Sequence, residues 1–158
     1  MSLLLNGSKT MTIAGTEMQA IEIYTGESYT LPITFTYPNT APINCTGWSL
    51  STSVKYYLSD TVSYTSSTVI LGNLTPLTNV YSGTGLTATF TSASTGVGYL
   101  YIPTDLANGS NGSPSISFTN TTANSTLAVI TLGVTRTDAQ SSKTDYNKEP
   151  IGVIVRYQ

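Results

Sequence analysis

Apolar and polar residues alternate with a period of two along most of this chain. Between residues 29 and 37, the apolar set Tyr29, Leu31, Ile33 and Phe35 alternates with threonines and a proline, a pattern typical of a half-buried strand. Residues 48–58 repeat the alternation. Six further runs are rich in Thr, Val, Ile or Tyr, as strands are: 68–71, 86–91, 97–102, 115–118, 127–137 and 151–157. No segment of useful length has the helical period, so the sequence predicts an all-β fold.

Short turn-forming clusters separate these runs. Gly, Ser and Asn gather at residues 82–85, 94–96 and 108–114, and such clusters mark connections between strands. Residues 25–28 predict a hairpin turn that joins strands at 20–24 and 29–37. About eight short strands with turns between them favour an antiparallel immunoglobulin-like β-sandwich, in which 48–58 is expected to be a central strand.

Both ends look like additions to this sandwich. The chain has 158 residues, a length that fits one domain. We expect residues 1–19 to form an N-terminal arm that docks on a neighbour, and residues 20–137 to form the sandwich. Residues 138–158 are expected to be a C-terminal hairpin extension that completes the sheet. Its last strand is apolar on both faces, which predicts burial on both sides.

Charge is scarce and unevenly placed. Only 9% of the residues are charged, against about 25% in an ordinary soluble domain. Asp105 is the one Asp, Glu, Lys or Arg between residues 61 and 135, whereas residues 136–156 hold seven of the fourteen charges. One interpretation is a surface kept soluble by 29 threonines and 20 serines. The other, which we favour, is a surface covered by other subunits, since interface cores are poor in charge and rich in Tyr.

Several function classes conflict with this composition. A net charge of −2 with six basic residues argues against nucleic-acid binding. The chain has no histidine, which removes the common nucleophile and zinc arrangements. Cys45 is the single cysteine and is expected to be a buried apolar side chain. We find neither a secretory signal at the start nor an apolar run long enough for a membrane span.

The remaining candidate sites have ordinary structural explanations. The acids show no catalytic pair, so we expect no enzyme activity, no cofactor and no metal. Residues 105–112 superficially suit calcium but lack the acidic ligands of a competent loop, and an Asn/Gly turn explains them better. Trp48 is expected in the core. Tyr56 and Tyr57 must point to opposite faces of one strand, and the outward tyrosines leave carbohydrate recognition open.

Two stretches resemble a known family. Residues 25–35 read TGESYTLPITF and residues 41–48 read APINCTGW. They are similar to the opening of the N-terminal β-sandwich of phage baseplate upper proteins, and residues 90–102 resemble a later strand pair of that family. Cys45 stands where the family has Leu, and the charged hairpin at 136–156 lies outside the family pattern. The resemblance implies an immunoglobulin-like, non-enzymatic domain embedded in a tail or baseplate.

The sequence therefore predicts a bacteriophage structural protein of the virion, in the tail or baseplate, that is assembled in the host cytoplasm. Its expected partners are other virion proteins and further copies of itself, without nucleic acid or membrane. The alternatives are a capsid decoration (cement) protein and a carbohydrate-binding adhesin that recognises a host-surface glycan. The expected assembly contacts are the charges of the C-terminal hairpin: Arg136, Lys143, Asp145, Lys148, Glu149 and Arg156.

Overall fold

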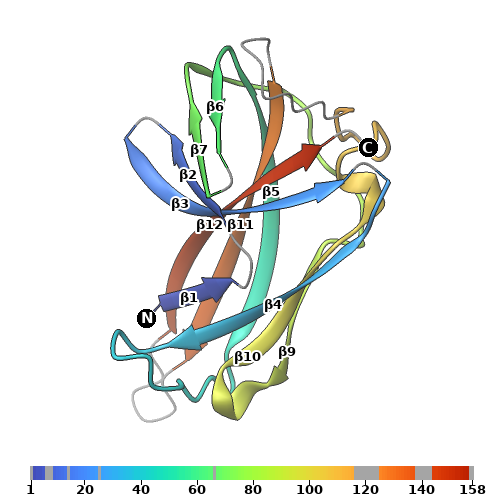
Figure 1. The fold of residues 1–158 in the computed structure, drawn as a ribbon. Helices are drawn as coiled ribbons and strands as arrows, with labels where there is room; N and C mark the ends of the chain where they lie inside the picture. The colour runs from blue at the N-terminus through green and yellow to red at the C-terminus, as the bar shows by residue number, and fades with distance from the viewer. Residues whose placement is uncertain are drawn as a thin grey trace.

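Two β-sheets that pack face to face make up the computed structural model (Figure 1), which describes residues 2–5, 9–13, 15–24, 26–65, 67–115, 125–137 and 144–156. The all-β prediction is confirmed. The strands are β1 (Ser2–Leu5), β2 (Lys9–Ile13), β3 (Thr16–Tyr24), β4 (Tyr29–Thr36), β5 (Ser49–Ser59), β6 (Val62–Tyr64), β7 (Thr68–Leu71), β8 (Leu74–Pro76), β9 (Thr87–Ser92), β10 (Val97–Ile102), β11 (Ser125–Thr137) and β12 (Thr144–Arg156). Two 3₁₀ turns, η1 (Ala93–Thr95) and η2 (Thr104–Leu106), follow β9 and β10.

The smaller sheet has four strands in the order β1-β4-β10-β9, and all its pairings are antiparallel. Alternation sets which side chains face the core. Leu31, Ile33 and Phe35 of β4 are buried, as are Leu100 and Ile102 of β10. The predicted runs at 68–71 and 97–102 coincide with β7 and β10. Residues 116–118 of the run predicted at 115–118 lie outside the described residues.

The larger sheet has eight strands in the order β6-β7-β2-β3-β12-β11-β5-β8. The prediction of a purely antiparallel sandwich is wrong for this sheet, because β12 pairs with β3 in parallel and β2 pairs with β7 in parallel. Both parallel pairs join strands that are far apart in the sequence. No short turn connects such strands, so the turn pattern that predicted antiparallel neighbours contained no signal for them.

The hairpin predicted across residues 25–28 is also wrong. A turn is present, where the Glu27 N–H donates to the Tyr24 carbonyl at 3.1 Å and Gly26 takes a φ of 84°. However, β3 and β4 belong to different sheets. Ile21 and Ile23 of β3 share one core with the buried residues of β4, so the turn carries the chain across that core instead of along one sheet.

The C-terminal hairpin occupies the middle of the larger sheet. β11 pairs with β12 from Ala128↔Val153 to Thr137↔Thr144, and β12 lies between β11 and β3. Ile151 and Val153 pack in the core between the sheets, whereas Ile154 packs on the opposite face. The prediction that the last strand is buried on both sides is confirmed.

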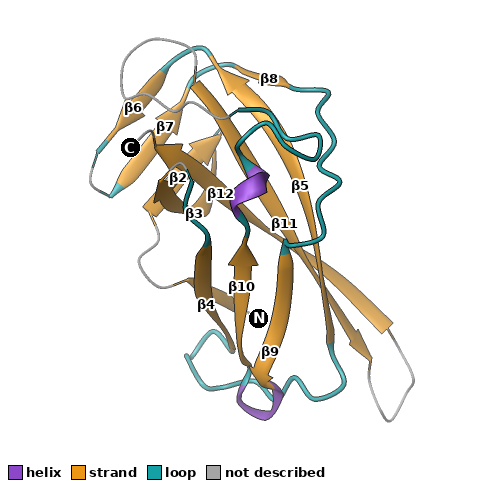
Figure 2. Ribbon diagram, turned by 90° about the vertical axis from the view of Figure 1, so that its right-hand side faces the viewer, coloured by secondary structure: helices purple, strands orange, loops and turns teal. Residues whose placement is uncertain are grey.

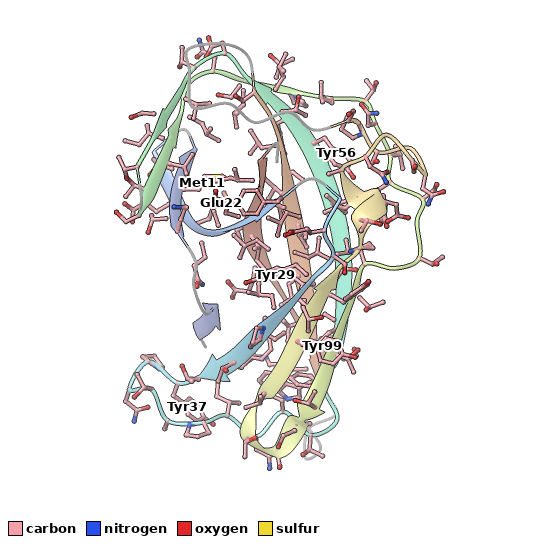
Figure 3. All side chains as sticks on the ribbon, turned by 45° about the vertical axis from the view of Figure 1, so that its right-hand side comes forward. Met11, Glu22, Tyr29, Tyr37, Tyr56 and Tyr99 are labelled. Carbon is pink, nitrogen blue, oxygen red and sulfur yellow. The ribbon has the colours of Figure 1, made fainter. Side chains whose placement is uncertain are left out.

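The larger sheet curls around a second core. Met11, Val69, Leu127 and Ile154, from four different strands, pack together on the face away from the smaller sheet. Figure 3 labels Met11 inside this curl. Gly152 leaves room for the Met11 side chain, since a Cβ at residue 152 would lie 2.7 Å from the Met11 Sδ.

Residues 1–19, where we expected an arm, contribute strands to both sheets. β1 pairs with β4 at one edge of the smaller sheet. β2 pairs with β3 and β7 in the larger sheet, and Lys9 of β2 lies 3.5 Å from the Glu22 carboxylate of β3. Removing this stretch would therefore take strands out of both sheets.

Candidate functional site

One side of the main core is incompletely covered. Its fully buried members come from many strands, but its partly buried members gather along β5, β9 and the segment between them. We call this set the open side: Trp48, Leu50, Val54, Leu77, Tyr81, Ala88 and Phe90. Figure 2 shows β9 next to β5 on this side of the molecule. The open side is therefore apolar surface that the chain leaves partly exposed to solvent.

The open side exists because β5 and β9 both lack a full neighbour. β8 covers β5 only at Tyr57, Leu58 and Ser59, so the prediction that 48–58 is a central strand is wrong for its first part. Period-two alternation shows that one face of a strand is buried, but it does not show how many strands lie beside it. β9 has β10 on one side and is the last strand of its sheet.

An aromatic cluster of Phe35, Trp48 and Phe90 lies at one end of the open side. The ring of Phe35 lies 6.4 Å from Trp48 and 5.8 Å from Phe90, measured between centroids. The guanidinium carbon of Arg136 lies 5.5 Å from the Trp48 ring centroid, within the range of a cation–π contact. Trp48 was expected in the core; it packs against the core but is only half-buried, so the prediction is confirmed in part.

A hollow of about 290 Å³ lies at the other end of the open side, beside Val54 and Tyr81. It is open to solvent and is lined by hydroxyl and aliphatic groups: Thr52, Ser53, Val54, Val80, Tyr81, Gly83 and Leu86. Val80 is 76% exposed, and the Thr52 hydroxyl donates to the Leu86 carbonyl at 3.0 Å. No charged side chain lines this hollow, so it suits van der Waals and hydroxyl contacts.

Asp105 organises the loops beside the hollow. Its carboxylate accepts a hydrogen bond from the Tyr81 hydroxyl at 2.5 Å and another from the Asn111 amide at 2.6 Å. Ser113 donates to the Asp105 carbonyl at 2.8 Å. Burial, together with the hydrogen bond to Asp105, raises the pKa of Tyr81 well above its usual value. The only charge of the 61–135 stretch is therefore used within the chain, and its two oxygens hold loops together.

The outer face of the smaller sheet is uncharged. Tyr99 and Tyr101 of β10 lie on this face, and Figure 3 labels Tyr99. Tyr99 is opposite Pro32 and Thr89, and Tyr101 is opposite Thr30 and Thr87. This surface has two aromatic rings two residues apart on one strand, with threonines around them.

The predicted charged contacts are spread along the C-terminal hairpin. In the β11–β12 register Arg136 is opposite Asp145, Lys148 is opposite Gly133 and Glu149 is opposite Leu132. Arg156, at the other end of β12, pairs with Tyr24, about 36 Å along the strand from Asp145 at about 3.3 Å per residue. Lys143 lies outside the described residues. The fold thus brings Arg136 and Asp145 to paired positions but does not gather all six residues into one site.

Two of these residues are partly enclosed by their own chain. Arg136 stacks on Trp48. Glu149 is half-buried, opposite Leu132 of the main core, and this burial raises its pKa above the usual Glu value. Neither placement could be predicted from the sequence, because the spacing of the charges does not determine which side chains they contact.

Two further features of the described residues bear on catalysis and metal binding: the lining of a second hollow and the grouping of the acidic side chains. A second hollow, of about 510 Å³, lies between β2, β7 and β8 and has no titratable side chain in its lining. Among the described residues, no three of the His, Cys, Asp and Glu side chains are grouped so that they could hold a metal ion. No helix within those ranges is long and apolar enough to cross a bilayer.

The buried residues Cys45 and Tyr56 have structural roles. Cys45 is fully buried, as predicted, and burial raises the pKa of its thiol to about 11. Tyr56 is 1% exposed, and its hydroxyl donates to the Leu106 carbonyl at 2.6 Å. Burial, followed by the charge of Asp105, raises the pKa of Tyr56. Tyr57 packs against the second core instead, which confirms that the two adjacent tyrosines point to opposite faces.

Sequence reasoning missed the open side as a candidate site. The only available signal was the absence of charge from residues 86–92, in which Ala88 and Phe90 alternate with threonines. The comparisons with known proteins add no relationship: no protein-family model matches the chain, and the search of curated proteins finds no match.

Proposed function

We propose that this chain is a bacteriophage virion structural protein of the tail or baseplate, which acts by packing against its neighbours. The observation that carries the proposal is the open side, a strip of partly exposed core residues along β5 and β9. Apolar surface of this kind, where Arg136 on Trp48 is the one charge described in contact with it, is typical of the centre of a protein–protein interface. Its partners would be other virion proteins and further copies of the chain. The role requires no catalysis, cofactor or metal.

The immunoglobulin-like relationship to baseplate upper proteins is part of this proposal. It rests on the motifs at residues 25–35 and 41–48. In the fold, Gly26 and Gly47 of these motifs have φ values of 84° and 85°, which few other residues adopt. The motifs therefore coincide with turns that need glycine.

The direct test is the composition of particles made by the genome that encodes this chain. Mass spectrometry of purified particles should detect the chain at a fixed copy number, and immunogold labelling should mark the tail end. Labelling over the shell would instead support a capsid decoration protein. Absence of the chain from purified particles would contradict both.

A carbohydrate-binding adhesin is the second candidate, and Tyr99 and Tyr101 on the outer face of the smaller sheet favour it. Aromatic rings spaced along a flat surface can stack on sugar rings. Glycan-array binding that is lost in Tyr99→Ala and retained in Thr89→Ala, on the same face, would support this function. Equal binding by both variants would count against the tyrosines as its basis.

A further inference from the structure

The free edge of β9 is an unprotected pairing site. We propose that a second copy of this chain pairs with β9 antiparallel across a twofold axis at Thr89, so that two four-stranded sheets join into one. The inference deepens the proposed function and rests on it for biological meaning, because it names the surface and the partner of the assembly contact.

β9 differs from the other edge strands of the described sheets. Its six residues contain neither a charge nor a proline. β1 has four residues, and β6 and β8 have three each, with Pro76 in β8. Natural proteins usually block sheet edges with short strands, Lys or Pro, because an exposed edge pairs with other chains. β9 has none of these three devices. It does carry a β-bulge, a further device of this kind, where the register skips Thr91 near the end of the strand.

The other long edge on this side is partly occupied. The chain between β8 and β9 runs beside β5, where the Leu77 N–H donates to the Tyr56 carbonyl at 2.9 Å. Thr52 of β5 donates to the Leu86 carbonyl, just before β9 begins. β5 also exposes Lys55. β5 lies next to β9, but among the described residues no hydrogen bond joins β5 to residues 87–92. The backbone groups on this edge of β9 are therefore not paired with β5.

The side chains of β9 are complementary to themselves. Directly opposite residues in an antiparallel pair lie on the same face of the sheet. An axis at Thr89 therefore places Thr89 opposite its copy and Thr87 opposite Thr91, which gives Thr–Thr pairs on the outer face. On the inner face Ala88 would meet Phe90, a small residue against a large one. This pairing would cover the half-exposed Ala88 and Phe90 of the open side.

An axis at Ala88 fits less well. It would place Phe90 opposite Leu86 of the partner, but Leu86 is already buried and its carbonyl already accepts from Thr52. The register at Thr89 uses residues 87–91, for which the described structure shows no hydrogen bond on the free edge.

The absence of charge favours a second copy as the partner. None of β1, β4, β9 and β10 contains an acidic or basic residue. Two such sheets can approach without like-charge repulsion and without desolvating an ion. A charged partner would find no complementary group on this sheet.

The contact is small when taken alone. Five paired residues bury less than the roughly 1,000 Å² expected of a stable interface, so two free copies should associate weakly. In an assembly other contacts raise the effective concentration of the edges. A test must therefore trap the pair instead of relying on a stable dimer.

Disulfide trapping of Thr89→Cys provides this test. Opposite Cβ atoms in an antiparallel pair lie about 4.5–5.5 Å apart, close enough for a disulfide after a small shift. Mild oxidation of the purified full chain should give a dimer linked through residue 89, read by non-reducing gel and mass spectrometry. Thr34→Cys is the matched control, since Thr34 lies on the same outer face but on β4, with strands on both sides. It should give several-fold less dimer.

A second pair of variants tests the register. Thr87→Lys in the Thr89→Cys background places two lysines beside the axis, which should lower the yield of dimer several-fold. Thr34→Lys in that background should leave the yield unchanged. A folded Thr89→Cys chain that does not dimerise, or that dimerises no faster than Thr34→Cys, would overturn the proposal.

The test separates this inference from the proposed function. If the chain is found in particles but Thr89→Cys links there to a different virion protein, or to nothing, the self-pairing is wrong and the virion role stands. If the dimer forms in solution but the chain is absent from particles, the pairing stands and the virion role is wrong.

Discussion

The Tyr81 hydroxyl donates a hydrogen bond to the Asp105 carboxylate at 2.5 Å, and this bond joins the segment before β9 to the turn after β10. Asp105→Asn should lower the free energy of unfolding by about 1.5–3 kcal/mol, the range for hydrogen bonds to a charged group. Urea unfolding followed by circular dichroism measures this loss.

Tyr81→Phe serves as the matched variant, since it removes only the hydroxyl. If the two residues act through their mutual bond, the double variant should lose less than the sum of the single losses. Thr104→Ala, at an exposed neighbour, should change stability by no more than about 0.5 kcal/mol. Strictly additive losses would show that Asp105 acts mainly through Asn111.

Arg136→Gln should weaken the packing of the aromatic cluster around Trp48. Loss of the stacking on Trp48 is expected to cost about 0.5–2 kcal/mol. Trp48 is the single tryptophan, so its fluorescence emission should shift to longer wavelength as the ring gains contact with water. Lys55→Gln, on the exposed face of β5, should leave both the emission and the stability unchanged, and a shift of equal size there would argue against the contact.

Gly98→Ala should destabilise the smaller sheet. A Cβ at residue 98 would lie 2.4 Å from the Thr89 carbonyl oxygen and 3.1 Å from the Phe90 Cα. Both are backbone atoms, so β9 would have to move. Overpacking of this kind costs about 1–3 kcal/mol. Thermal unfolding should show the loss, with Thr89→Ala as a surface control, and an unchanged melting temperature for Gly98→Ala would contradict the β9–β10 register.

Asp60 should contribute to stability in a pH-dependent way. Slight desolvation raises its pKa, but hydrogen bonds from Asn73 and Thr61 outweigh this and hold it below the usual Asp value. The folded state therefore favours the carboxylate. Its contribution is present above the unfolded pKa of about 3.9 and is lost as the pH falls through the lower folded pKa. The stability difference between the native chain and Asp60→Asn should shrink on acidification from pH 6 to this range; a constant difference would count against the mechanism.

Cys45 should resist thiol reagents in the folded chain. Its thiol is fully buried and its pKa is raised to about 11, so little of the reactive thiolate forms at pH 8. Stabilisation by the neutral thiol is complete below the unfolded pKa of about 8.5 and is lost as the pH rises through about 11. Labelling with a chromogenic disulfide should follow global unfolding in urea, whereas the exposed thiol of Thr89→Cys should react at once. Rapid labelling of native Cys45 would contradict its burial.

Alternation and apolar content predicted much of this fold. They located the strands at 68–71 and 97–102 and the burial of Ile151, Val153 and Ile154 on two faces, because these properties depend on each strand's own side chains. They could not predict which strands pair in parallel, since the pairing of β12 with β3 depends on contacts across more than a hundred residues.

The candidate site was harder to predict from the sequence than the strands were. Counting charges led to the prediction that much of the surface is covered by neighbours, with the charged hairpin as the contact. It did not predict that Phe90 and Ala88 are half-exposed beside an unpaired edge. Whether an edge is free depends on the strand that is missing beside it, and no property of residues 87–92 alone reports that.

The position of β12 in the middle of the larger sheet also affects how the molecule comes to be folded. β3 is synthesised early, yet its neighbour on one side is β12, so the sheet cannot close until residues 144–156 have been made. Contacts between such distant segments slow folding, and unpaired strands invite aggregation in the meantime. Production of this protein should therefore respond strongly to growth temperature and to chaperone supply, more than its size alone would suggest.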